Sequence, residues 1–196
     1  MSQISSDGQY FNYVRLDDGT IILNDGMNEV ARFTFIEGQL QLLDLKQYSF
    51  DHVYAESVME FSYSENSQLS RITEDGKVAD VYWNFQGDII RIETDRVTYT
   101  FEYDNKRNPF YQLPVPADYS PTNGFGFAIN YFCLHNVTDY KWTYRSEDRE
   151  PFDGHIEYDY ISGLPKKTEW TATDSLSDNI LHGAGCEFRY EKVIGE

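Results

Sequence analysis

The feature that most constrains this chain is a strand-like alternation repeated three times between Val58 and Asn105. Each run ends on two aromatic residues spaced two positions apart: Phe61 and Tyr63, Trp83 and Phe85, and Phe101 and Tyr103. A β-strand points alternate side chains to opposite faces, so each pair lies on one face and marks it as the buried one. Aromatic and β-branched residues suit such a half-buried surface. The repeat therefore predicts strands with one apolar and one polar face.

Turn residues separate the alternating runs along the chain. Glu37-Gly38, Asp75-Gly76 and Gly87-Asp88 supply the positive φ angles that two-residue hairpins require. In Leu40–Leu45 the leucines change faces, which predicts a β-bulge or a strand buried on both sides. We count roughly 12–14 strands, more than most sheets hold, so the sheet is expected to curl. The predicted fold class is all-β: an antiparallel meander in a strongly curved or partly closed, barrel-like sheet.

The regular pattern stops in the middle of the chain. Residues 109–121 hold four of the six prolines, and proline cannot donate to a strand ladder, so a crossing outside the sheet is expected. At most one short helix is predicted, near 123–136. Its apolar residues recur at helical spacing: Phe125, Ile129 and Phe132. We predict a single domain over 1–196, with a first lobe at 1–108, the crossing and helix at 109–136, and a second lobe at 137–196.

Charge and composition limit the classes of partner. The chain of 196 residues carries a net charge of −17, spread evenly along it, which repels phosphate backbones and argues against nucleic acid. No apolar run is long enough for a membrane helix, so the chain is not expected to span a membrane. The opening MSQISSDG is polar, so the protein is either intracellular or trimmed of an export signal.

Catalytic motifs are weak. None of the histidines His52, His135, His155 and His182 pairs with another at metal-ligand spacing, and we predict no metal and no cofactor. Cys133 and Cys186 form no CxxC motif, and a disulfide between them is left open. Cys186 with His182 or His135 could act as nucleophile and base, but a buried or bridged cysteine is the preferred interpretation. No catalytic residue is predicted.

Aromatic residues are the best candidates for binding. They make up 16% of the chain, and an exposed set would stack on sugar rings, whereas core packing is the simpler interpretation. The candidate binding residues are Trp83, Trp142, Trp170, Tyr119 and Phe125. Since the regular strands specify a sheet, a site is expected in the irregular segments 106–136, 146–155 and 174–185.

Several ordered motifs resemble a known family. Phe101–Phe110, Leu134–Thr138 and Gly163–Lys167 follow one another as in the DUF4595 family, uncharacterised proteins of Bacteroidetes described as having a porin-like β fold. Glu102-Tyr103-Asp104 and Glu157–Tyr160 also resemble the Y-x-Y-D repeats of Rhs-like proteins, although the glycine after Tyr-Asp is absent. The resemblance implies an exported or cell-envelope β protein, a lipoprotein whose signal has been removed. It transfers no catalytic residues.

Three functional hypotheses follow. The first is a non-enzymatic, exported or cell-envelope binding module that holds a glycan, an apolar ligand such as a lipid, or a protein on its curved aromatic sheet. The alternative is a structural or assembly scaffold. A hydrolase that uses carboxylates, with His155 or His182, is the third, and it requires two carboxylates roughly 5–10 Å apart in one cleft. The oligomeric state is left open.

Overall fold

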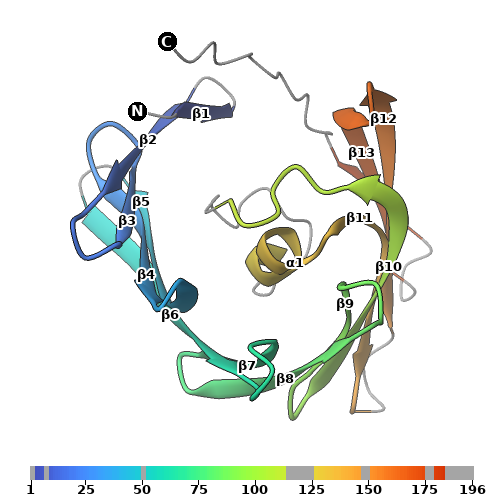
Figure 1. The fold of residues 1–196 in the computed structure, drawn as a ribbon. Helices are drawn as coiled ribbons and strands as arrows, with labels where there is room; N and C mark the ends of the chain where they lie inside the picture. Colours follow the sequence, from blue (N-terminus) through green and yellow to red (C-terminus); the bar gives the residue numbers. More distant parts are fainter. Residues whose placement is uncertain are drawn as a thin grey trace. The chain divides into compact units, whose positions relative to one another are not determined.

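The computed structural model describes residues 3–6, 9–49, 52–113, 126–146, 151–174 and 179–183. Within these residues the chain is all-β apart from one short helix (Figure 1). The elements are β1 (Gln3–Ser6), β2 (Gln9–Arg15), β3 (Ile21–Asn24), β4 (Glu29–Ile36), β5 (Gln39–Ser49), β6 (His52–Tyr63), β7 (Leu69–Glu74), β8 (Lys77–Trp83), β9 (Ile89–Glu93), β10 (Val97–Arg107), α1 (Gly126–Phe132), β11 (His135–Tyr144), β12 (Phe152–Ile161), β13 (Leu164–Asp174) and β14 (Asn179–Gly183).

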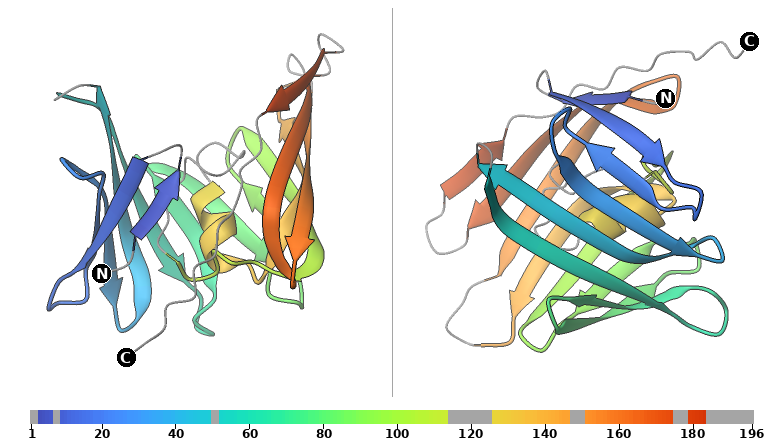
Figure 2. Two further views of the ribbon diagram at one scale, coloured as in Figure 1. Left: turned by 90° about the horizontal axis from the view of Figure 1, so that it is seen from above. Right: turned by 90° about the vertical axis from the view of Figure 1, so that its left-hand side faces the viewer.

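The chain divides into two compact units, Met1–Val81 and Tyr82–Glu196. In the first, each strand from β1 to β8 pairs antiparallel with the next along the chain; in the second, β9 to β14 do the same (Figure 2). The predicted all-β antiparallel meander with one short helix is confirmed. Within the described residues, neither meander closes on itself. The prediction of a single domain stays a prediction.

The first unit is built on cross-strand apolar rows. Phe33 on β4 stands opposite Leu43 on β5, which stands opposite Met59 on β6, and all three are buried. A second row begins at Phe61, opposite the fully buried Ile72. Such directly opposed side chains are the unit of sheet stabilisation. The first aromatic pair therefore marks the buried face, as its spacing predicts.

The change of face in the leucine run is a β-bulge. Thr34 pairs with Leu42 whereas Phe35 pairs with Leu40, so Gln41 is the extra residue of β5. Because the bulge changes the parity, both Leu40 and Leu43 are buried. The predicted turns are also present: Glu37 and Gly38 have φ angles of 52° and 82°, and Asp75 and Gly76 have 48° and 79°.

The second unit combines the strands β9 to β14 with the helix. Ile89 and Ile92 on β9, Phe101 on β10 and Tyr140 on β11 are buried, as are Ala128 and Ile129 of α1. The described helix has seven residues and ends before residue 136, because the chain turns at Cys133 and enters β11 at His135. Among the described residues, no helix has the length and apolar character to span a membrane.

Two sequence predictions about local structure are wrong. The first is that Trp83 and Phe85 share a buried face: β8 ends at Trp83, and Phe85 lies in a turn with 97% of its surface exposed. The Asn84 side chain closes that turn by accepting hydrogen bonds from the backbone N–H groups of Gln86 (2.9 Å) and Asp88 (3.0 Å). This local hydrogen bonding ends the strand before its alternation is complete.

The second concerns the segments expected to be irregular. Residues 152–155 belong to β12 and 179–183 form β14, so parts of the predicted loops 146–155 and 174–185 are strand. In 152–155 the polar residues Asp153 and His155 are exposed on either side of the buried Gly154, so they occupy the polar face of the sheet. Residues 114–125, 147–150 and 175–178 lie outside the described residues.

Candidate functional site

Three aromatic residues stand side by side across three strands of the second unit. Tyr99 on β10 is opposite Trp142 on β11, and Trp142 is opposite Phe152 on β12. The Tyr99 and Trp142 rings meet edge-on with centroids 5.7 Å apart, and the Trp142 and Phe152 rings are 4.8 Å apart and tilted by 31°. We call these three residues the aromatic row. All three side chains are half-buried, so each keeps part of its ring exposed.

The row sits at the margin of the core. The next residues on the same face are Phe101 and Tyr140, which are buried, and Gly154 on β12 is opposite Tyr140. A side chain on Gly154 would collide with that ring, because its Cβ would lie 2.0 Å from Tyr140 Cζ. The glycine therefore makes room for the Tyr140 ring. This ring packs beside the row, with its centroid 6.3 Å from that of Trp142 and 6.2 Å from that of Phe152. Burial raises the pKa of Tyr140 to about 12.

One polar atom in the row lacks a partner. The indole N–H of Trp142 is buried and has no hydrogen-bond acceptor among the described residues. A buried donor without an acceptor costs roughly 1–3 kcal/mol, and most native donors avoid this. The row therefore combines flat apolar rings with one unsatisfied donor, the combination of groups that small-molecule sites use to bind and orient a ligand.

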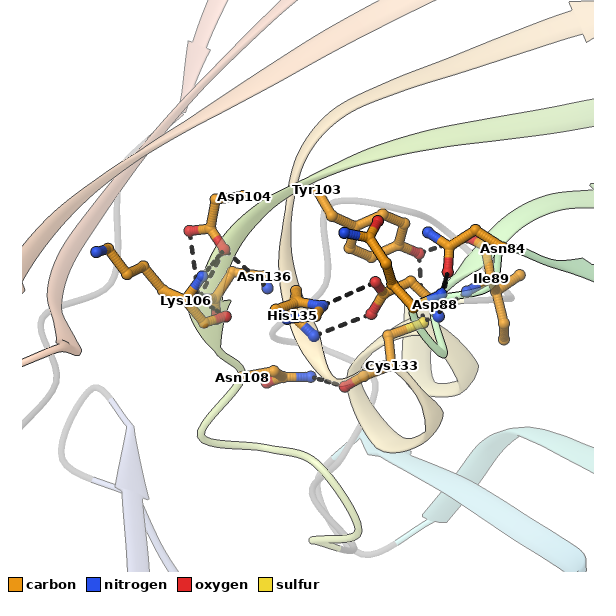
Figure 3. A network of polar contacts seen from close by, with 11 residues as sticks. Asn84, Asp88, Ile89, Tyr103, Asp104, Lys106, Asn108, Cys133, His135 and Asn136 are labelled. Carbon is orange, nitrogen blue, oxygen red and sulfur yellow. Dashed lines mark hydrogen bonds and ion pairs between the residues drawn. The ribbon is translucent and has the colours of Figure 1, made fainter.

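A polar network lies near the beginning of β9 and β11 (Figure 3). At its centre is Asp88, whose side chain is 1% exposed. Asp88 Oδ1 accepts the backbone N–H of His135 at 3.0 Å, and Oδ2 lies 2.8 Å from His135 Nδ1. Because the Asn84 side chain also holds the Asp88 backbone, the turn before β9 and the start of β11 are joined by fixed hydrogen bonds.

Cys133 belongs to the same network. Its Sγ accepts the Ile89 N–H at 3.2 Å and lies 3.3 Å from the Tyr103 hydroxyl, which donates to the Ile89 carbonyl at 2.5 Å. Because the Tyr103 hydroxyl donates its proton to the Ile89 carbonyl, the Cys133 thiol is the donor in the contact with the Tyr103 oxygen. Burial raises the pKa of Tyr103 and raises that of Cys133 from 9.0 to about 12. The thiol is therefore a structural group, because nucleophilic cysteines have lowered pKa values.

This burial predicts an inert thiol in the folded protein. The raised pKa lowers the thiolate fraction of Cys133 about a thousandfold at pH 8, so alkylation by iodoacetamide should be undetectable in buffer and rapid in guanidinium. Because the thiol of the unfolded chain ionises at lower pH than the buried one, the neutral Cys133 thiol stabilises the folded state below pH 9. This stabilisation is lost as the pH rises from 9 toward 12. Peptide mass spectrometry, with the Cys186 peptide quantified separately, gives the rate. Equal labelling in both conditions would contradict the burial.

The two motifs that resemble Y-x-Y-D repeats meet in this network. The Tyr160 hydroxyl donates to Asp104 Oδ2, and Asn136 Nδ2 lies 3.2 Å from the Tyr160 oxygen and 3.4 Å from both Asp104 oxygens. Burial, and then the Asp104 carboxylate, raise the pKa of Tyr160. Asn108 closes the helix end, because its Nδ2 donates to the carbonyls of Asn130 at 2.8 Å and Cys133 at 2.9 Å. These contacts hold strands and helix together, and they leave no nucleophile in the network.

The histidine of the hydrolase hypothesis lies on the polar face. His155 Nδ1 is 2.6 Å from Asp139 Oδ1, and Nε2 is 4.0 Å from Glu157 Oε1. The His155 ring and the Asp139 carboxylate are about half exposed and the Glu157 carboxylate is 77% exposed, as in ordinary surface ion pairs. His182 lies on β14, and its side chain is outside the description. No group of three or more possible metal ligands occurs among the described residues.

The candidate aromatic residues lie in different parts of the structure. Trp142 is the centre of the aromatic row, and Trp83 ends β8 as a half-buried residue. Trp170 lies on β13 opposite Ile156, but its side chain is outside the description, as are Tyr119 and Phe125 entirely. The sequence did not single out Tyr99 or Phe152. Their alternation was visible, but the register that aligns them with Trp142 was not.

The comparisons with known proteins support the fold alone. The chain is similar in structure to a porin-like protein from Bacteroides vulgatus ATCC 8482, with a TM-score of 0.57 and 14% sequence identity. The match covers 98% of this chain and 94% of the other. No family profile matches the chain, and no curated protein matches it. The porin-like β fold expected from the sequence is supported, whereas membership of DUF4595 and the Rhs-like repeats stay predictions.

Proposed function

We propose that this chain is a non-enzymatic binding module of the bacterial cell envelope, and that it takes its ligand at the aromatic row. The observation that carries the proposal is the half-exposed row of Tyr99, Trp142 and Phe152 with the unsatisfied indole N–H at its centre. Flat rings stack on the apolar face of a sugar or on an apolar ring, and a small rotation of the Trp142 ring would bring its buried N–H to such a ligand as a hydrogen-bond donor.

The envelope location is supported by the likeness to a porin-like Bacteroides protein. An exported lipoprotein is the form that the resemblance to DUF4595 implies. Among the ligand classes, we favour a glycan over a lipid or a protein, because a sugar offers both a flat apolar face and hydroxyl acceptors. The scaffold hypothesis is the alternative: it requires a folded protein that binds none of these classes and assembles through an edge strand such as β14.

Replacing Trp142 by phenylalanine is expected to weaken ligand binding about tenfold, because it keeps a ring but removes the indole face and its N–H. A glycan array identifies the ligand, and titration followed by tryptophan fluorescence or calorimetry measures the affinity. Trp83→Phe is the matched control, since it also removes one tryptophan but lies outside the row. Its affinity should equal that of the parent.

Two results would contradict the proposal. One is a ligand whose affinity falls equally in Trp142→Phe and Trp83→Phe, which would place binding elsewhere. The other is a folded protein for which a glycan array, a lipid-extract assay and a protein pull-down all give no ligand. An oligomer that dissociates when proline is introduced into β14 would then favour the scaffold alternative.

A further inference from the structure

One end of the second unit gathers exposed apolar and cationic side chains. Neighbouring strands are antiparallel, so the start of β9, the end of β10, the start of β11 and the end of β12 all lie at the same end of this unit. Six exposed side chains occupy that end, and we call them the basic apolar end: Phe85, Leu134 and Ile161, with Lys106, Arg107 and Lys166.

The apolar members are held outward by fixed structure. Phe85 is 97% exposed because Asn84 closes the turn beneath it. Leu134 packs against the same turn, since a Cβ at Gly87 would lie 2.9 Å from its Cδ1, and yet 37% of its surface is exposed. Ile161 is 55% exposed at the tip of the β12–β13 hairpin. Single exposed apolar residues are ordinary, but three at one end of a unit make that end a candidate contact surface.

Strand pairing and hydrogen bonds link several of these positions. Arg107 pairs with His135 across the strands, and His135 directly follows Leu134 in the chain. The neighbouring Asn136 donates to the Lys106 carbonyl at 3.2 Å and contacts the hydroxyl of Tyr160, the residue before Ile161. The Lys106 ammonium points away from this network (Figure 3). The polar network therefore acts as the frame that holds the basic apolar end together.

Among the described residues, the cations of this end are unpaired, although the whole chain is acidic. The chain carries −17, yet no described carboxylate lies within ion-pair distance of Lys106, Arg107 or Lys166. The carboxylates nearby make hydrogen bonds to other groups than these cations: Asp88 to His135, and Asp104 to Tyr160 and Asn136. The exposed Asp159 stands opposite Lys167 in the register, and Lys167 also contacts Glu169. Three cations are therefore available to an external anion beside three exposed apolar side chains.

We infer that the basic apolar end docks on an anionic lipid surface. Apolar side chains that enter the interface and basic ones that stay at the headgroups are the combination that holds proteins on such surfaces. A bilayer also accepts separate apolar side chains on different segments, whereas a protein partner would need a matching pocket for each. The total charge of −17 repels an anionic bilayer at a distance, so the protein binds in one orientation, through this end.

The inference is independent of the proposed ligand site. Trp142 lies two residues before the end of β11 at Tyr144, whereas the basic apolar end lies at the start of β11, at His135. The aromatic row is therefore near the opposite end of the strands. Docking through the basic apolar end leaves the row away from the lipid headgroups.

The test is co-sedimentation of the full chain with phosphatidylglycerol–phosphatidylcholine vesicles and with pure phosphatidylcholine vesicles. Binding is expected only when phosphatidylglycerol is present. The triple variant Lys106→Gln, Arg107→Gln, Lys166→Gln should reduce the partition coefficient about a hundredfold, at about fivefold for each cation. Phe85→Ser should reduce it about tenfold, because one phenylalanine no longer enters the interface.

Matched controls separate this surface from general charge and apolarity. The triple variant Arg96→Gln, Lys141→Gln, Arg145→Gln makes the same charge change, with Arg145 and Arg96 joined by a backbone hydrogen bond of 2.9 Å at the opposite end. Met27→Ser removes an apolar side chain that is 91% exposed in the first unit. Both controls should bind vesicles like the parent.

Four outcomes would overturn the inference. Absence of binding to phosphatidylglycerol vesicles is the first, and equal binding to pure phosphatidylcholine is the second. The third is an equal loss in the two triple variants, which would assign binding to total charge. Light scattering is measured in parallel: a dimer that Phe85→Ser converts to a monomer would show that a second copy of the chain covers this end instead.

Discussion

Replacing Gly154 by alanine is expected to destabilise the protein by about 3 kcal/mol. The new Cβ would lie 2.0 Å from Tyr140 Cζ and 2.3 Å from its hydroxyl oxygen. The Tyr140 side chain cannot change its rotamer to avoid this contact, because it is buried among Trp142, Phe152 and the core. The backbone is not the cause, since Gly154 has an ordinary strand conformation in which alanine by itself would be favoured.

Urea unfolding followed by circular dichroism measures the change. Tyr140→Leu shortens the side chain and should restore room for the alanine, so the double variant should be no less stable than Tyr140→Leu alone. A coupling free energy close to the full cost of Gly154→Ala is therefore expected, because the two residues are in direct contact. If the two changes were additive, the loss would have to come from the backbone and not from the ring.

Replacing Asp88 by alanine is expected to cost about 3 kcal/mol or more of folding free energy, because it leaves the backbone N–H and ring of His135 without their buried acceptor. The loss should loosen the start of β11 and the basic apolar end with it. Asp88→Asn keeps one acceptor oxygen and should cost roughly half as much.

Asp153→Ala is the matched control for this prediction. Asp153 is exposed and lies 3.5 Å from Lys141, so removing its carboxylate should change stability by less than about 1 kcal/mol. Urea midpoints of the three variants, with hydrogen exchange of the His135 amide, give the comparison. A loss in Asp88→Ala no larger than that in Asp153→Ala would show that the buried pair does not stabilise the second unit.

The alternation of side chains predicted much of the secondary structure. Val97, Tyr99, Phe101 and Tyr103 are all on β10, and the change of parity in Leu40–Leu45 is a true bulge. Two-residue periodicity and glycine turns are local properties, which is why they can be recognised without tertiary contacts. The end of β8 was predicted wrongly, because the Asn84 side chain competes with the ladder for backbone hydrogen bonds.

The candidate site was only partly predictable. Trp142 was a candidate, but its neighbours depend on the register of β10, β11 and β12, which places Tyr99 and Phe152 beside it. A shift of one residue in any of these strands would move the rings to the other face. The role of Gly154 also depends on that register, because a glycine is required there only when the Tyr140 ring lies opposite it.

The sequence by itself determined that this chain forms antiparallel strands with a marked buried face, that it is strongly acidic, and that it carries no recognisable catalytic motif. Only the tertiary structure decided which aromatic side chains meet, which carboxylates are occupied, and where cations and apolar residues gather. The physical reason is that face selection follows from neighbours along the chain, whereas a site is made by residues far apart in the chain. Asp88 and His135, 47 positions apart, illustrate this.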